Sequence, residues 1–345
     1  MADHDSVYVQ TADTASQLLE WLSPRGQFFR DTGPYEWLFR GHGDARFELV
    51  PTALRPEKRS RLLKSSVAIL PDSPDTNGIQ FLAEANLLHE FLDVANDTGL
   101  PIPGIDPAAL MQLGAISDCI HHGNRDEMAS RVTTRFGWRY WPPIELLSLM
   151  AIARHSRLLT RVLDWTYSPT TAAYFAAASE VRKIEDPANR HIAGSLYLSV
   201  WAVHRFAAND FPHHGHVIQP NDFCLLQLPY EPNRNMFAQS GALTIVPLEN
   251  DKFSTPTDRR SIDKIISAGA VQFVQRIEKK CNGLNLPVPQ KTAFEFRLPW
   301  DKAHELLCAL FCDRISHNRM YPSYEGVVAA MDERLVLMQY SSRKR

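Results

Sequence analysis

The chain has 345 residues, of which 44% are hydrophobic and 22% are charged, and its formal net charge is −2. This composition excludes a wholly disordered chain and a broadly basic surface of the kind that coats nucleic acid. The length allows one large domain or two smaller ones.

Cysteine usage and the distribution of apolar residues predict a cytoplasmic protein. The five cysteines contain no CxxC pair, so we expect reduced thiols and no disulfide framework or zinc site. They are Cys119, Cys224, Cys281, Cys308 and Cys312. The first residues are polar and acidic, unlike a signal peptide, and no stretch reaches the roughly 18 apolar residues of a membrane span. We therefore expect no membrane association.

The first half of the chain predicts helices around one early strand. Apolar spacing indicates helices over residues 14–30 and 80–95, and a helix that starts at Pro142-Pro143. Residues 35–56 predict a strand, a glycine-bounded turn and a second extended piece. Residues 64–78 are rich in Ser, Pro, Asp and Gly, which is typical of a loop.

The second half has more short strands, separated by Pro, Asn and Gly. They are predicted at residues 194–203, 224–229, 241–247 and 293–299, and a last helix at 302–312. There is no internal repeat, no regular βαβ alternation and no linker. The sequence therefore predicts an α+β fold in a single large domain.

The stretch RLLTRVLDWTYSPTTAAYFAA, residues 157–177, places three unlike polar and aromatic groups at one strand-to-helix corner. An apolar strand ends in Asp164-Trp165-Thr166, and Ser168-Pro169 is a typical helix start. Free N–H groups at a helix N-terminus bind phosphate, and Trp165 can stack on a flat ring. In the alternative reading, Asp164 caps a turn and Trp165 belongs to the core.

Residues 154–176 resemble the central motif of the FRG domain family. The matching residues are His155, Thr160, Arg161, Asp164, Trp165, Thr166, Ser168, Pro169 and Phe175. The family's namesake tripeptide is similar to Phe39-Arg40-Gly41. Residues 233–247 resemble its Gln-x-Gly strand, and residues 296–327 resemble its C-terminal helix with a Tyr-Pro…Gly turn. The chain departs from the family at Arg154, where Gln is usual, and at residues 156–159, which lack the common Gly and Pro.

The resemblance implies one FRG-like domain over residues 1–345. Its core motifs would be residues 35–56, 144–180, 194–247 and 293–330, and insertions would occupy 57–79 and 98–139. The order of the motifs is similar to that of ADP-ribosyltransferases. This implies a mixed or antiparallel strand core of that type, surrounded by helices.

The same likeness implies NAD as the substrate and ADP-ribosyl transfer, or NAD cleavage by water, as the reaction. Arg40 would clamp the phosphates through its planar donor fork. The implied catalytic residues are Arg40, Asp164 and Gln239. The implied NAD-binding residues are Phe39, Gly41, His155, Thr160, Arg161, Trp165, Thr166, Ser168 and Phe175. The resemblance also implies a protein or nucleic-acid target, and a role as a toxin or in antiviral defence.

Gln239 is a poor match to this chemistry. Cleavage of the nicotinamide–ribose bond builds positive charge on the sugar, and a carboxylate stabilises that charge better than an amide. Asp164 or Glu295 can supply the carboxylate, although Glu295 in an alternating strand more often points to solvent. Otherwise the domain is a non-catalytic module that binds a nucleotide or a nucleic acid.

Several of these residues have simpler explanations. Arg40 can be an ion-pair partner of Asp44, Arg161 can pair with Asp164, and His155 can orient a turn. The cluster His213, His214 and His216 can hold a metal through imidazoles. However, Asp210 is the one acidic or cysteine ligand nearby, so we predict no metal.

Overall fold

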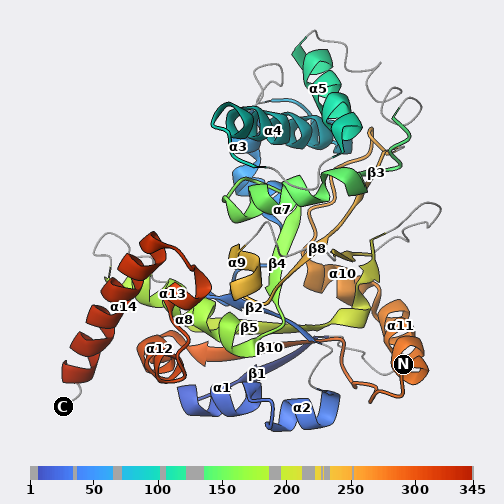
Figure 1. Ribbon diagram of the computed structural model, residues 1–345. Helices are drawn as coiled ribbons and strands as arrows, with labels where there is room; N and C mark the ends of the chain where they lie inside the picture. The colour runs from blue at the N-terminus through green and yellow to red at the C-terminus, as the bar shows by residue number, and fades with distance from the viewer. Residues whose placement is uncertain are drawn as a thin grey trace.

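The computed structural model describes residues 7–33, 37–64, 72–101, 106–121, 136–185, 196–211, 222–226, 228, 234–250 and 252–343. Its centre is an eight-stranded sheet with the order β1-β10-β5-β2-β4-β8-β7-β6 (Figure 1). The strands are β1 (Val7–Thr11), β2 (Trp37–His42), β4 (Val162–Thr166), β5 (Tyr197–His204), β6 (Asn209–Asp210), β7 (Cys224–Leu226), β8 (Gly241–Ile245) and β10 (Ala293–Pro299). The pairs β1–β10 and β6–β7 are parallel and the others are antiparallel, so the sheet is mixed. A separate pair joins β3 (Tyr140–Trp141) to β9 (Leu248–Glu249).

Helices lie on both sides of the sheet (Figure 1). The described helices are α1 (Ala15–Leu22), α2 (Gln27–Thr32), α3 (Arg59–Lys64), α4 (Asn77–Asp97), α5 (Pro107–His121), α7 (Leu147–His155), α8 (Pro169–Glu185), α9 (Arg234–Ala238), α10 (Ile262–Ala268), α11 (Ala270–Gly283), α12 (Ala303–Cys312), α13 (His317–Met320) and α14 (Tyr324–Arg343). In Figure 1, α3, α4, α5 and α7 lie together above the sheet, and α1, α2 and α12 lie below it. None of these described helices is long and apolar enough to cross a membrane.

Successive side chains along a strand point to opposite faces of the sheet, and this separates two of the three hydrophobic clusters. In β2, Phe39 packs into the cluster formed with α1, α2, α8 and α12, whereas its neighbour Leu38 packs into the cluster formed with α10 and α11. A third cluster joins α3, α4, α5 and α7 to β4, β7 and β8 through residues such as Val162 and Leu243. All three clusters share the one sheet, and the described chain forms a single domain with α and β elements.

Most predicted elements are present, with shifted ends. The helix expected over residues 14–30 is two helices, because the chain leaves the helical conformation at Ser23 and Gly26. The second extended piece expected before residue 56 is instead a pair of short 3₁₀ turns, Thr52–Leu54 and Pro56–Lys58. The predicted strands correspond to β5, β7, β8 and β10.

The second half contains the predicted strands and the helix predicted at 302–312, which is α12, but this helix is not the last and further helices were missed. Helices α10 and α11 precede β10, and α13 and α14 follow α12. In α11 the residues Phe273, Ile277 and Cys281 recur every four positions and are buried, as in an amphipathic helix. The Tyr-Pro…Gly stretch does not end the fold in a turn, since Gly326 lies inside the first turn of the 20-residue helix α14.

Candidate functional site

A cavity of about 280 Å³ opens where β2 and β4 separate. Strand β2 pairs with β5 from Trp37 to His42, but it pairs with β4 at Phe39–Thr166 alone. The cavity is lined by Phe39, Arg40, Gly41, Arg154, His155, Arg157, Asp164, Trp165, Thr166, Phe175, Gln239 and Tyr321. The structure therefore brings together the namesake tripeptide, the strand-to-helix corner and Gln239, as the motif order predicts.

Arg40 bridges the gap between the two strands. Its Nη1 donates to the backbone oxygen of Asp164 at 2.6 Å, and its Nε donates to Nε2 of His42 at 2.9 Å. Burial and the charges of Arg40 and Arg55 hold the pKa of His42 well below its usual value, so the imidazole is neutral and can accept. Burial also lowers the pKa of Arg40 to about 10, with the charge of Asp164 opposing this shift and that of Arg154 adding to it. At neutral pH Arg40 is still a cation.

The other two residues of the tripeptide have structural roles. The Phe39 ring is fully buried against Phe28 and Phe29. A Cβ at Gly41 would lie 1.9 Å from the backbone oxygen of Ala172, so only glycine lets α8 approach β2 this closely. The tripeptide thus anchors one wall of the cavity and exposes Arg40 to it.

Asp164 is the acid at the centre of the cavity, and Arg154 is its main partner. Nε and Nη2 of Arg154 donate to Oδ2 at 2.8 and 2.5 Å, and Nη1 of Arg40 lies 3.8 Å from the same oxygen. Burial alone would raise the pKa of Asp164. The charges of Arg154 and Arg40, together with the hydrogen bonds from Arg154, outweigh burial and lower it. Asp164 is therefore ionised at neutral pH, and its partner is not the Arg161 that the sequence suggested.

The end of α7 delivers three more polar groups to the cavity. The backbone N–H of Leu158 bonds to the oxygen of Ala153 at 2.9 Å, and Arg157 takes a left-handed conformation with φ of 66°. This cap turns Arg154, His155 and Arg157 toward the cavity. Burial, and to a smaller extent the charge of Arg154, lowers the pKa of His155 although Asp164 opposes the shift. His155 is therefore neutral at pH 7.

The lining of this cavity carries more positive than negative charge. Three guanidinium groups, those of Arg40, Arg154 and Arg157, accompany one carboxylate, that of Asp164. Arg55 lies near enough for its charge to lower the pKa of Arg40. Within the described ranges Arg157 has no ion-pair partner. Such a site attracts an anion with at least two negative charges.

The hydroxyls of the corner hold the backbone in place. Thr166 Oγ1 donates to the backbone oxygen of Gln239 at 2.6 Å and accepts from the N–H of Ser168 at 2.9 Å. Ser168 Oγ accepts from the N–H of Thr171, which caps α8 as the sequence predicts, and Ser168 does not line the cavity. The predicted hydroxyl donors therefore stabilise the corner.

Of the two rings expected at the cavity, Phe175 faces it and Trp165 belongs to the core. The Trp165 indole is 3% exposed and donates to Oγ1 of Thr244 at 2.8 Å. It packs in the cluster with α10 and α11, because successive strand residues point to opposite faces and Asp164 faces the cavity. The structure supports the core alternative for this indole. Phe175 and Tyr321 meet edge to face at the cavity, with ring centroids 6.3 Å apart.

Gln239 lies in the turn between α9 and β8, and not within a strand as the motif suggested. Its Nε2 donates to the backbone oxygen of Met320 at 3.1 Å. This bond ties the turn to the segment that presents Tyr321. The side chain of Gln239 therefore connects two walls of the cavity.

Thr160 and Arg161, which the resemblance placed at the site, do not line the cavity. The Thr160 N–H donates to Oγ1 of Thr52 at 3.2 Å, and the residue is buried. Arg161 forms a buried ion pair with Glu84, whose Oε2 accepts from Nε at 2.6 Å. Arg161 is structural because its guanidinium already has a partner inside the core, and Thr160 is buried away from the cavity.

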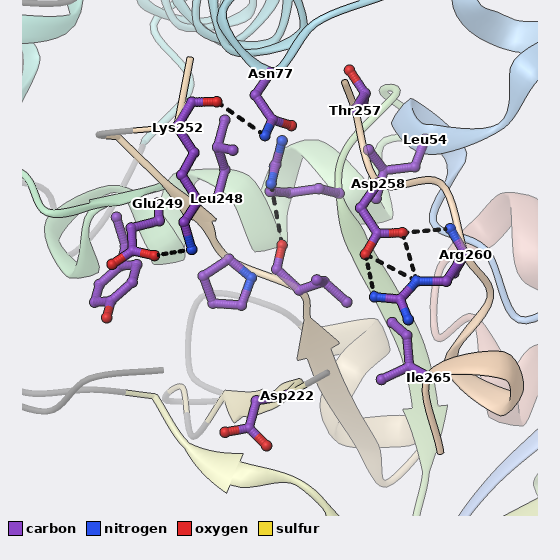
Figure 2. Close-up of a pocket in the computed structure, with 14 residues that line it drawn as sticks. Leu54, Asn77, Asp222, Leu248, Glu249, Lys252, Thr257, Asp258, Arg260 and Ile265 are labelled. Carbon is purple, nitrogen blue, oxygen red and sulfur yellow. Dashed lines mark hydrogen bonds and ion pairs between the residues drawn. The ribbon is translucent and has the colours of Figure 1, made fainter. Parts of the chain in front are cut away.

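Arg161 instead lines a second cavity of about 230 Å³ (Figure 2). There its Nη1 donates to the backbone oxygen of Val246 at 3.1 Å. Figure 2 shows Lys252 beside Glu249 and Arg260 bonded to Asp258, at 2.6 Å in each case. The charges of this cavity neutralise one another, so it lacks the excess positive charge of the first.

The expected exposure of Glu295 and the expected partner of Asp44 both differ from what the structure shows. Glu295 is 2% exposed and its Oε2 accepts from Nη2 of Arg297 at 2.6 Å, so the expected solvent-facing acid is wrong. Asp44, the expected partner of Arg40, pairs with Arg46.

The histidines at 213, 214 and 216 lie outside the described residues. The part of the chain that the structure describes contains no cluster of His, Cys, Asp and Glu that can hold a metal.

Comparison with known families places this cavity in context. The FRG domain family matches residues 120–185, a segment that includes α7, β4 and α8. The chain contains an FRG domain. The match includes Arg154, Asp164 and Phe175 of the cavity, whereas Arg40 and Gln239 lie outside it. It begins within the stretch 98–139 that we expected to be an insertion. No curated protein and no solved structure matches the chain.

Several groups at the cavity between β2 and β4 were not predicted from the sequence. Arg154 and Arg157 stood out as departures from the family pattern and were not assigned to the site. Tyr321 and His42 were not singled out either. The available signal was the pair of arginines three residues apart at the end of an apolar helix, directly before the strand that carries Asp164.

Proposed function

We propose that the cavity between β2 and β4 binds NAD, and that the FRG domain transfers ADP-ribose from it to a macromolecule or to water. The observation that carries this proposal is the excess of guanidinium groups around the single carboxylate of Asp164. A diphosphate supplies the negative charge that such a site needs, and guanidinium is the group best suited to phosphate. An ADP-ribosyltransferase-like strand core is part of this proposal.

The reaction breaks the bond between the ribose C1′ and the nicotinamide nitrogen. The electron pair of that bond leaves with the nicotinamide, which becomes neutral, and the sugar develops oxocarbenium-like charge. The ionised Asp164 stabilises this charge. An oxygen of water or of a protein or nucleic-acid target then forms the new bond to C1′ and releases its proton to solvent. The products are nicotinamide and ADP-ribose, free or attached.

The two rings at the cavity fit the remaining part of the ligand. Phe175 and Tyr321 lie edge to face in the lining of the cavity, and both are partly buried. In this proposal they hold the nicotinamide, a role that the resemblance implied for Trp165 or Phe175. No metal takes part in the proposed reaction.

A second candidate is a binding module without catalysis. It is favoured by the two hydrogen bonds that Asp164 accepts from Arg154, because a carboxylate already neutralised by a guanidinium stabilises a sugar cation poorly. It is also favoured by Gln239, a neutral amide whose nitrogen is bonded to Met320. Such a module would bind a nucleotide or a nucleic acid and leave it intact.

Incubation of the purified protein with NAD separates the two candidates. We expect release of free nicotinamide, measured by chromatography, and loss of that release in Arg40→Ala. The matched control is Arg46→Ala, which removes an exposed arginine that follows β2 and does not line the cavity, so it should change nothing. Binding of NAD without release favours the module, and absence of both binding and release contradicts both candidates.

We include the role as a toxin or antiviral effector in this proposal. An active enzyme that consumes NAD harms the cell that contains it, so expression should lower cellular NAD and arrest growth. Expression of Arg40→Ala at the same level should do neither. Growth arrest by the variant as well would contradict a toxic role that depends on NAD.

A further inference from the structure

The ion pair between Arg154 and Asp164 uses one carboxylate oxygen only. Oδ2 accepts from both Nε and Nη2 of Arg154, whereas Oδ1 is buried and has no hydrogen-bond partner among the described residues. The strong form of such a pair is bidentate, with one donor for each oxygen. A buried carboxylate oxygen without a donor costs free energy. The hydrogen-bonding capacity of the Asp164 carboxylate is thus only partly used.

Arg154 is also surrounded by like charges. Arg40 approaches the same oxygen of Asp164 to 3.8 Å, and Arg157 lines the cavity three residues further along the chain. Arg55 also lies near enough to interact with Arg154. Burial lowers the pKa of Arg55, and the charge of Arg154 lowers it further. One carboxylate cannot neutralise these four guanidinium groups.

Among the described residues, Arg154 has one weak bond besides those to Asp164. Its Nη1 lies 3.4 Å from Oγ1 of Thr52, and its side chain is 14% exposed toward the cavity. It sits in the last turn of α7, so rotation of the long side chain requires no movement of the helix. Arg40, in contrast, is held by His42 and by the backbone of Asp164.

We propose that Arg154 exchanges partners when a diphosphate enters the cavity. In the free protein it neutralises Asp164, and in the complex its fork turns to the phosphate oxygens. This rests on the proposed function, because it assumes that the ligand carries a diphosphate. The consequence for the reaction is that Asp164 loses its main counter-charge only when the ligand is bound, next to the sugar whose charge it stabilises, and keeps only the more distant Arg40.

The exchange makes Asp164 and the ligand competitors for Arg154, and a double-mutant cycle measures this competition. The probe is inorganic pyrophosphate, and the measurement is its Kd by calorimetry for the wild type, Arg154→Gln, Asp164→Asn and the double variant. In the wild type Arg154 must leave Asp164, so Arg154→Gln should weaken binding only slightly. In the Asp164→Asn background Arg154 is available, and the same substitution should weaken binding about tenfold more.

Thermal melts of the four proteins verify that each is folded, and Arg157→Gln is the matched control. Because Arg157 has no acidic partner within the described ranges, its substitution should weaken pyrophosphate binding equally in both backgrounds. An equal effect of Arg154→Gln in both backgrounds, or no binding of pyrophosphate to the wild type, overturns the exchange. The double-mutant cycle measures binding and needs no turnover. Coupling between Arg154 and Asp164 in a protein that releases no nicotinamide would therefore support the exchange of partners and contradict only the proposed enzymatic activity.

Discussion

Removal of the Arg161 side chain should destabilise the fold and spare the cavity. Arg161 is 4% exposed and Glu84 is 2% exposed, and Nε and Nη2 of Arg161 donate to the two Glu84 oxygens at 2.6 and 3.0 Å. In Arg161→Met, Glu84 keeps only its bonds from Trp141 at 3.0 Å and Gln80 at 2.7 Å. A buried charge that loses its partner typically costs about 3–5 kcal/mol. At about 2 °C per kcal/mol, the Tm should fall by about 6–10 °C.

Denaturant unfolding and calorimetry on the same preparations test this. Replacement of both partners, in Arg161→Met with Glu84→Leu, should recover most of the lost stability because no unpaired charge is left behind. The folded single variant should bind ADP-ribose as the wild type does. A Tm within about 1 °C of the wild type, or loss of ADP-ribose binding in the folded variant, would refute the structural role of Arg161 and return it to the site.

Four further predictions concern single residues. Arg40→Lys keeps the charge but loses the planar fork, so nicotinamide release should fall at least about tenfold, and near-normal release would make Arg40 a mere counter-charge. Asp164→Asn should lower nicotinamide release about a hundredfold or more, yet tighten ADP-ribose binding measured by calorimetry. Unchanged release per folded molecule together with a lower Tm would make Asp164 structural. Arg157→Gly relieves the backbone strain of a φ of 66°, so the free energy of unfolding should rise by about 1 kcal/mol. The same variant should bind ADP-ribose less tightly. Equal stability in denaturant would contradict the strain. Burial, helped by the charge of Arg205, lowers the pKa of His204 from 6.5 to about 3. The unfolded chain therefore takes up the proton first, and stability is lost as pH falls below 6.5, by about 2 kcal/mol between pH 7 and 5. Melts of His204→Asn should lack this part of the pH dependence, and an unchanged dependence would contradict it.

The strand-to-helix corner was predictable from local sequence alone. Strand β4 ends at Thr166 and α8 begins at Pro169, because Ser168-Pro169 is a strong start signal and a short apolar run precedes it. The approach of Arg40 to Asp164, 124 residues apart, has no local signal. It was predicted from the order of the family motifs, which carries long-range information that periodicity lacks.

The partners of the charged residues were not predictable. Asp164 pairs with Arg154 because α7 packs against β4, and Arg161, directly before the strand, pairs with Glu84 of α4. Sequence spacing favoured Arg161 for Asp164 instead. Helix α14 was missed because it exposes apolar residues such as Met331 and Leu335, at 62% and 57%, so its polar and apolar faces do not separate.

The affinity of the protein for ADP-ribose, measured by calorimetry, tests the central claim most directly. That claim is that the cavity between β2 and β4 is a site for a diphosphate-bearing nucleotide. We predict binding of one ADP-ribose per chain, weakened at least about tenfold in Arg40→Ala and unchanged in Arg46→Ala. The absence of binding to the wild type, or equal affinity in the two variants, would contradict the claim.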